Sequence, residues 1–251
     1  MASEKNAPPV LHFATLDSTN EEALRQLAQG AQSPLWIVAD EQARGRGRSG
    51  RIWQSPKGNL YASLLLRLNL SASVATQLSF VAALAAFDAI ASQLPPQETG
   101  SLRLKWPNDV MLGGAKVAGI LIESLADPAG SRLAAIAGIG VNVSSAPQTL
   151  DRPARALGLA PSACAAIFAA LASSFESWLN RWQEGTGFAA IREAWLSRAH
   201  APGEAISVHL NNTPVRGTFL GIDERGALKL ETSAGVVITL TAGDIYPDAQ
   251  G

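Results

Sequence analysis

The sequence has few of the features that mark secreted or membrane-spanning proteins. One cysteine, Cys164, occurs in 251 residues, so no internal disulfide can form and a reducing compartment is expected. The longest apolar run, Phe80 to Ile90, is too short to span a bilayer and contains Asp88. Residues 1–10 are polar and carry two prolines where a secretory signal would have an apolar core. We therefore expect a cytoplasmic protein with a flexible tail over residues 1–10.

The chain also lacks an excess of charge of either sign. Lysine and arginine total 20 and aspartate and glutamate total 21, which gives a net charge of -1. Bulk attraction to nucleic acid or to an anionic membrane is therefore absent, and any phosphate chemistry requires a local cluster of charge. The three histidines, His12, His200 and His209, lack metal-ligand spacing and are assigned no role.

The pattern of apolar residues predicts a larger α+β domain followed by a small all-β barrel. A helix is expected after Ser18, which has capping-box spacing to Glu21. The break at 201–203 marks a boundary, which predicts units of 11–201 and 202–251. In the larger unit the expected strands are 36–39, 60–68, 102–106, 110–112, 116–123 and 133–143, and the expected helices begin at Ser73, Pro161 and Phe188. In the barrel, Asn211-Asn212 is expected to turn the chain, and the strands lie at 206–210, 215–220, 227–230 and 236–240.

An arginine- and glycine-rich loop, residues 42–51, joins two of these strands. It places four arginines among three glycines, a combination that allows close backbone approach and bidentate binding of carboxylate or phosphate oxygens. A solvated basic turn is the alternative for this segment taken alone. Gly45, Gly47 and Gly50 also match the dinucleotide fingerprint, but the helix and the later acidic residue that it needs are missing. A phosphate-binding P-loop is excluded because no Gly-Lys-Ser/Thr follows.

Four further segments carry polar residues or glycines at the ends or in the middle of expected elements. Each has a simple local alternative: helix capping, an ordinary turn, an exposed lysine and a weakened strand, respectively. The segments are Asp17-Ser18-Thr19-Asn20, Lys105-Trp106-Pro107-Asn108-Asp109, Lys116 to Glu123, and Gly138-Ile139-Gly140-Val141-Asn142.

Taken together and in order, the five segments closely resemble the biotin protein ligase family, and the likeness runs from about Leu11 to Tyr246. The resemblance implies a mixed-sheet catalytic domain of the class II synthetase type, shared with lipoate ligases, followed by an SH3-like barrel. It also implies that ATP activates biotin as an acyl adenylate, with Mg²⁺ on the phosphates. Biotin then passes to a lysine of the biotin carboxyl carrier domain of acetyl-CoA carboxylase.

The resemblance further implies which residues form the site. The catalytic residues would be Arg46, Arg48 and Lys116. Biotin would contact Ser18, Thr19, Asn20, Gln42, Arg46, Gly47, Arg48, Lys116 and Gly119. ATP or the adenylate would contact Arg48, Arg51, Trp53, Asn108, Asp109 and Asn142. The metal ligands are left open. The arginine loop is expected to be disordered until an anionic ligand gives its arginines partners.

Two departures from the family pattern bear on these expectations. Arg44 stands where relatives commonly have a small residue, so the loop is more basic than usual. The chain starts almost directly at the expected catalytic domain, which leaves no room for a helix-turn-helix, so we expect no DNA binding. Two other functions stay open: a lipoate or octanoate ligase of related fold, and a nucleic-acid-binding module that uses the loop as a basic patch.

Overall fold

The computed structural model describes residues 7–128, 133–148, 153–210 and 213–247. Its larger part is a seven-stranded sheet in the order β1-β2-β3-β7-β6-β5-β4, in which β1 pairs parallel with β2 and every other pair is antiparallel. The sheet is therefore mixed, as predicted. Its strands are β1 (Val10–Phe13), β2 (Leu35–Ala39), β3 (Leu60–Leu68), β4 (Leu102–Lys105), β5 (Asp109–Leu112), β6 (Ala115–Ala126) and β7 (Leu133–Val141).

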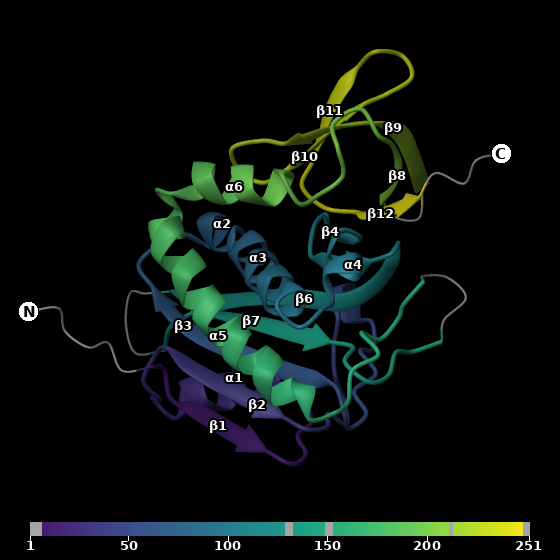
Figure 1. Cartoon of the computed structure of the whole chain (residues 1–251). Helices are drawn as coiled ribbons and strands as arrows, with labels where there is room; N and C mark the ends of the chain where they lie inside the picture. The colour runs from purple at the N-terminus through teal and green to yellow at the C-terminus, as the bar shows by residue number, and fades with distance from the viewer. Residues whose placement is uncertain (1–6, 129–132, 149–152, 211–212, 248–251) are drawn as a thin grey trace, which may run out of the picture.

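Helices cover both faces of this sheet (Figure 1). The main helices are α1 (Thr19–Ala28), α2 (Ala72–Ala75), α3 (Leu78–Ala91), α4 (Pro96–Thr99), α5 (Ala163–Trp182) and α6 (Phe188–Leu196), with short 3-10 turns at Arg48–Gly50 and Gln183–Gly185. Side chains alternate along a strand, so β3 contributes to two cores. Leu64 and Leu66 join the large core with α3 and α5, whereas Leu65 joins a smaller core with Ala23 and Leu27 of α1.

The segment Ala72–Ala91 is long and apolar enough to cross a membrane, but 67% of its 18-residue apolar window is buried inside the protein. Most residues of α3 are buried, including Leu84 and Ile90. The segment therefore forms the centre of the large core. The sequence predicted one long helix here, and the structure divides it at Thr76 and Gln77 into α2 and α3.

Two local expectations differ from the structure. Ser18 is the N-cap residue of α1, but its side chain makes no capping hydrogen bond. The predicted tail is too long, because Val10 begins β1 and the Trp36 amide donates to the Pro9 carbonyl at 2.9 Å. The expected turn at 211–212 lies outside the described residues.

A two-residue turn, Gly113-Gly114, links β5 to β6 with φ of 57° and 79°. Positive φ at both central residues is what a two-residue hairpin turn of this type requires.

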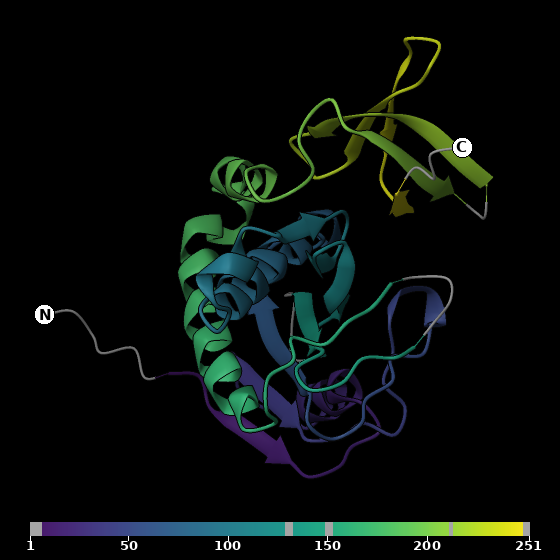
Figure 2. The same cartoon turned by 45° about the vertical axis from the view of Figure 1, so that its right-hand side comes forward.

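A second sheet, antiparallel throughout, lies above α6 and β4 in Figure 1, and the turned view of Figure 2 shows α6 leading into it. Its order is β11-β10-β9-β8-β12, and it corresponds to the predicted SH3-like barrel. The sequence prediction missed its last strand. The strands are β8 (Ala205–Leu210), β9 (Thr213–Ile222), β10 (Leu228–Glu231), β11 (Val237–Leu240) and β12 (Asp244–Pro247).

The barrel and the larger sheet share one continuous apolar core, to which the barrel contributes residues such as Phe219 and Leu228. The buried Trp106 indole donates to the Gly226 carbonyl at 3.0 Å. A side chain at Gly226 would come within 2.5 Å of the Phe80 ring. The barrel is therefore docked on the larger unit by close packing and a buried hydrogen bond.

Replacing Trp106 with phenylalanine tests this docking. The substitution leaves the Gly226 carbonyl without its buried donor, which is expected to lower the free energy of unfolding by about 1–3 kcal/mol beyond the loss of ring area. Trp195→Phe is the matched control, because within the described residues the buried Trp195 Nε1 has no hydrogen-bond partner. Urea unfolding should show the larger loss for Trp106→Phe, and equal losses would contradict the role of the hydrogen bond.

Candidate active site

One cavity of about 450 Å³ lies where the N-terminus of α1, the arginine loop and the strands β6 and β7 meet. Residues from every one of the five predicted segments line it, together with Asp244 of β12. All fourteen predicted site residues are among the lining: Ser18, Thr19, Asn20, Gln42, Arg46, Gly47, Arg48, Arg51, Trp53, Asn108, Asp109, Lys116, Gly119 and Asn142. Segments far apart in the sequence thus form one site.

A network of neutral polar groups forms one wall of the cavity. The backbone amide and hydroxyl of Thr19 donate to Gln42 Oε1 at 2.8 and 3.1 Å, and Gln42 Nε2 donates to Ser55 Oγ at 2.9 Å. The fully buried Ser63 hydroxyl lies 2.7 Å from Thr19 Oγ1 and 2.6 Å from Asn20 Oδ1. Such mutual bonds fix the orientation of amide and hydroxyl groups, which suits recognition of a polar, uncharged ligand.

A group of three charges surrounds the buried Asp109, and two of them, Asp109 and Lys116, also line the cavity. Lys116 Nζ is 2.5 Å from Asp109 Oδ1, and Lys105 Nζ is 3.4 Å from Asp109 Oδ2. Burial by itself would raise the pKa of Asp109, but the two lysines outweigh this effect and hold that pKa below its usual value. The three side chains carry a net charge of +1, so the group as a whole favours an anion nearby.

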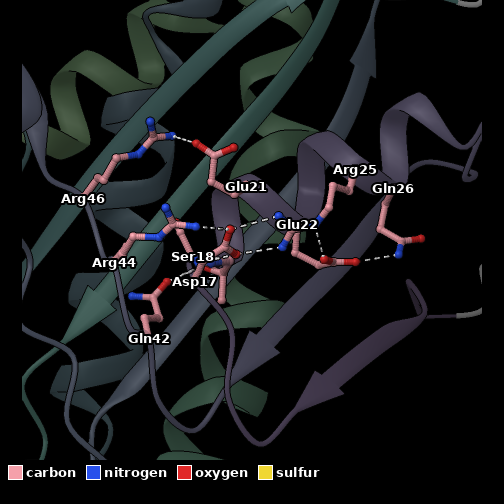
Figure 3. Close-up of polar contacts among 10 residues, drawn as sticks. Asp17, Ser18, Glu21, Glu22, Arg25, Gln26, Gln42, Arg44 and Arg46 are labelled. Atoms are coloured by element: carbon pink, nitrogen blue, oxygen red, sulfur yellow. Dashed lines mark hydrogen bonds and ion pairs between the residues drawn. The ribbon is translucent and has the colours of Figure 1, made fainter.

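The arginines of the loop have carboxylate partners within the protein. Arg46 lies 2.5 Å from Glu21 and 3.3 Å from Glu123, and Arg51 lies 2.6 Å from Asp244. Figure 3 shows Arg46 reaching Glu21 and Arg44 reaching Asp17. The reason given for expecting a disordered loop is therefore wrong: carboxylates from α1, β6 and β12 pair with the arginines without any ligand.

Arg48 is held by contacts from both sheets. Its Nη1 donates to Asn108 Oδ1 at 3.2 Å and to the Gly243 carbonyl at 3.4 Å, and it lies 3.6 Å from Asp244 Oδ1. The barrel thereby takes part in the site, which nothing in the sequence around Asp244 had indicated. A single aspartate in a barrel strand carries no motif by which to find it.

The glycines of β7 make room for side chains. A Cβ at Gly140 would lie 2.6 Å from the Trp53 indole, and one at Gly138 would overlap Asn20 Oδ1. Trp53 packs against the strands at Gly119 and Gly140, and Lys116 Nζ is 5.2 Å from its ring centroid. The space at these glycines is therefore filled by two side chains of the site itself.

The two asparagines predicted to bind nucleotide also hold the backbone around the cavity. Asn108 Nδ2 donates to the Ile120 carbonyl at 2.5 Å, and Asn142 Nδ2 donates to the carbonyls of Lys116 and Arg155, both at 3.4 Å. Both residues are buried. They therefore position the strand that carries Lys116 and Gly119.

Further lining residues were not predicted as site residues. They include Tyr61, whose pKa burial raises to about 12, and Pro147 and Ala154 of the segment that follows β7. Only their position in the folded chain brings them to the cavity. The remaining lining residues are Ile52, Gln54, Ile120, Leu121, Gly138, Ile139 and Gly140.

The carboxylates around the cavity do not form a metal site by themselves. In the described part of the chain, no three histidine, cysteine, aspartate or glutamate side chains lie together as a metal-binding group. Asp109 and Asp244, the carboxylates that line the cavity, are each ion-paired with two cationic side chains. Magnesium needs carboxylate or phosphate oxygens, so the donors of this site do not fit a protein-held Mg²⁺.

Comparison with known proteins explains why these motifs occur together. Residues 12–142 match the biotin/lipoate A/B protein ligase family, and residues 203–246 match the biotin protein ligase C-terminal domain. A biotin--[acetyl-CoA-carboxylase] ligase from Paracoccus denitrificans is 44% identical over 233 residues, which cover 89% of this chain and 94% of that protein. The chain belongs to the biotin protein ligase family.

Other members of the biotin protein ligase family are similar in sequence or structure. The bifunctional ligase/repressor of Bacillus subtilis is 31% identical over 90% of this chain and 70% of its own length. The Aquifex aeolicus biotin protein ligase in complex with biotin and ATP is 28% identical, with a TM-score of 0.75 over 95% of this chain and 97% of that one. Membership of the family makes the chain a ligase.

Asp109→Asn tests the buried charge group of this ligase. Because the folded pKa of Asp109 is lowered, its carboxylate contributes stability above its unfolded pKa of about 4, and that contribution is lost as pH falls through the lower folded value. Between the two values, one proton changes the free energy of unfolding by up to about 1.4 kcal/mol per pH unit. Urea unfolding measured between about pH 2 and 5 should show a smaller change in the free energy of unfolding per pH unit for the variant than for the wild type. An identical pH dependence in the two proteins would contradict the ion pairing.

Proposed function

We propose that this ligase activates biotin with ATP and transfers it to a lysine of the biotin carboxyl carrier domain of acetyl-CoA carboxylase. The observation that carries the proposal is that neutral polar groups and cationic side chains line one and the same cavity. A ligand with a polar uncharged ring and a carboxylate matches that combination. The Paracoccus relative, named a biotin--[acetyl-CoA-carboxylase] ligase, supports the identity of both substrates.

In the first step a carboxylate oxygen of biotin attacks the α-phosphorus of ATP, and pyrophosphate leaves. Negative charge gathers between the two anions, so cations fixed beside them stabilise the transition state. Arg48 and Lys116 are suited to this role because both line the cavity and are held in place by protein partners. Arg46 is paired with two carboxylates, so we assign it the positioning of the loop rather than direct charge stabilisation.

In the second step the lysine amine of the carrier attacks the acyl carbon, AMP leaves, and the amine loses a proton. No protein nucleophile is needed. Thr19, Asn20 and Gln42 would orient the biotin ring, while Trp53, Asn108 and Asn142 would flank the nucleotide. We propose that Mg²⁺ enters on the phosphates of ATP, because the carboxylates that line the cavity are already paired with cations. The cytoplasmic location and the absence of DNA or membrane partners stay predictions.

A lipoate or octanoate ligase is the second candidate, because the match over 12–142 describes a family that includes lipoate ligases. The match of 203–246 to the biotin protein ligase C-terminal domain favours biotin. The test is incubation with ATP, Mg²⁺ and each acid separately, followed by mass spectrometry for the acyl adenylate. Adenylate from biotin alone is expected, and adenylate from lipoate but not from biotin would overturn the proposal.

Arg48→Gly is expected to form the adenylate but to release it about tenfold faster, since one charge-assisted contact is lost and the loop gains backbone freedom. Arg44→Gly is the matched control: it adds the same freedom, but the Arg44 side chain is 80% exposed and does not line the cavity. The measurements are the off-rate of the adenylate and the labelling of a bystander protein. Equal off-rates for the two variants would refute the role given to Arg48.

A further inference from the structure

Glu123 ends the segment that begins with Lys116, yet no role has been assigned to it. It lies on β6, and its two carboxylate oxygens have different partners. Oε2 accepts a hydrogen bond from Asn20 Nδ2 at 2.7 Å, and Oε1 lies 3.3 Å from Arg46 Nη2. One carboxylate thus joins the polar wall of the cavity to the arginine loop.

The Asn20 amide is held at both ends. Its oxygen lies 2.6 Å from the Ser63 hydroxyl, and its nitrogen donates to Glu123. The residue is 3% exposed and packs against Gly138, where any larger residue would overlap its amide oxygen. Because a buried amide has little freedom to turn, displacement of Asn20 must be felt by the Glu123 carboxylate.

Arg46 has a second acidic partner that provides a comparison within the same site. Glu21 Oε1 lies 2.5 Å from Arg46 Nη2, and Glu21 comes from α1, directly after Asn20 in the sequence. Figure 3 shows Glu21 directed at Arg46. Both glutamates neutralise the same guanidinium, but only Glu123 also contacts the Asn20 side chain among the hydrogen bonds of the described residues.

We infer that Glu123 is a positioning residue that couples ligand contact at Asn20 to the placement of Arg46 and of the arginine loop. The inference rests on the proposed function, in which Asn20 lies beside biotin. A carboxylate is required because it accepts hydrogen bonds at both oxygens, whereas a glutamine would turn an N–H toward one of two donors. Biotin would then act on the loop through the protein as well as by direct contact.

The test measures biotin affinity without ATP in the full chain. Asn20→Ala, Arg46→Ala and the double variant are made in three backgrounds: the wild type, Glu123→Gln and Glu21→Gln. In the wild-type background, the fold-change in biotin Kd for the double variant should differ by about fivefold from the product of the fold-changes for the two single variants, as for residues in one hydrogen-bonded network. The same fivefold coupling factor is expected in the Glu21→Gln background. In the Glu123→Gln background the fold-changes of the single variants should simply multiply.

The possible results separate the two proposals. A factor that is unchanged in Glu123→Gln, or absent from the wild type, overturns the coupling. Failure of the wild type to bind biotin at all overturns the proposed function instead. Thermal unfolding of each variant checks that the fold is kept.

A second measurement does not require the Asn20 and Arg46 variants to fold. Trypsin cleaves after arginine, so the rate of cutting within 44–51 reports the placement of the loop. Saturating biotin is expected to slow this cutting in the wild type and in Glu21→Gln by about fivefold more than in Glu123→Gln, matching the coupling factor. Equal protection in all three proteins would overturn the inference.

Discussion

The structure of the site depends on balancing six cationic side chains, four of which line the cavity and two of which, Arg44 and Lys105, belong to the same segments. Arg44, Arg46, Arg48 and Arg51 come from one short loop, while Lys105 and Lys116 come from strands. Unpaired cations so close together would repel one another. Carboxylates from distant elements remove this cost: Asp17, Glu21, Glu123, Asp109 and Asp244.

The carboxylates that balance these charges come from different elements of the fold. Asp109 begins β5 and is buried between two lysines, so it must stay ionised for the pair to be stable. Asp244 is the contribution of the barrel, and it meets Arg51 at 2.6 Å. The barrel can reach that position because Trp106 and the packing of Gly226 on Phe80 hold it against the larger unit. Docking of the barrel and the charge balance of the site are therefore linked.

The ion pairs within the protein also shape how a ligand binds. Arg48 and Arg51 share Asp244 within the protein, so a phosphate must compete with a carboxylate or add to its contacts. Arg46 is held apart from them by Glu21 and Glu123. Arg46 thus contacts the side of the site that would recognise biotin, whereas Arg48 and Arg51 contact the barrel.

The sequence by itself determined most of the elements and part of the cavity lining. Periodic apolar residues predicted most of the strands and helices, because burial of one face requires that spacing. The five motifs and Trp53, through the family resemblance, supplied fourteen residues that the cavity brings together, but not Tyr61 or Asp244. Tertiary structure alone decided which carboxylate faces which arginine, because ion pairs between elements such as β12 and the loop depend on docking that leaves no local pattern. It also decided that Trp53 and Asn20 fill the space at the β7 glycines, and that barrel and sheet share a core, because packing is set by three-dimensional contact rather than by neighbours along the chain.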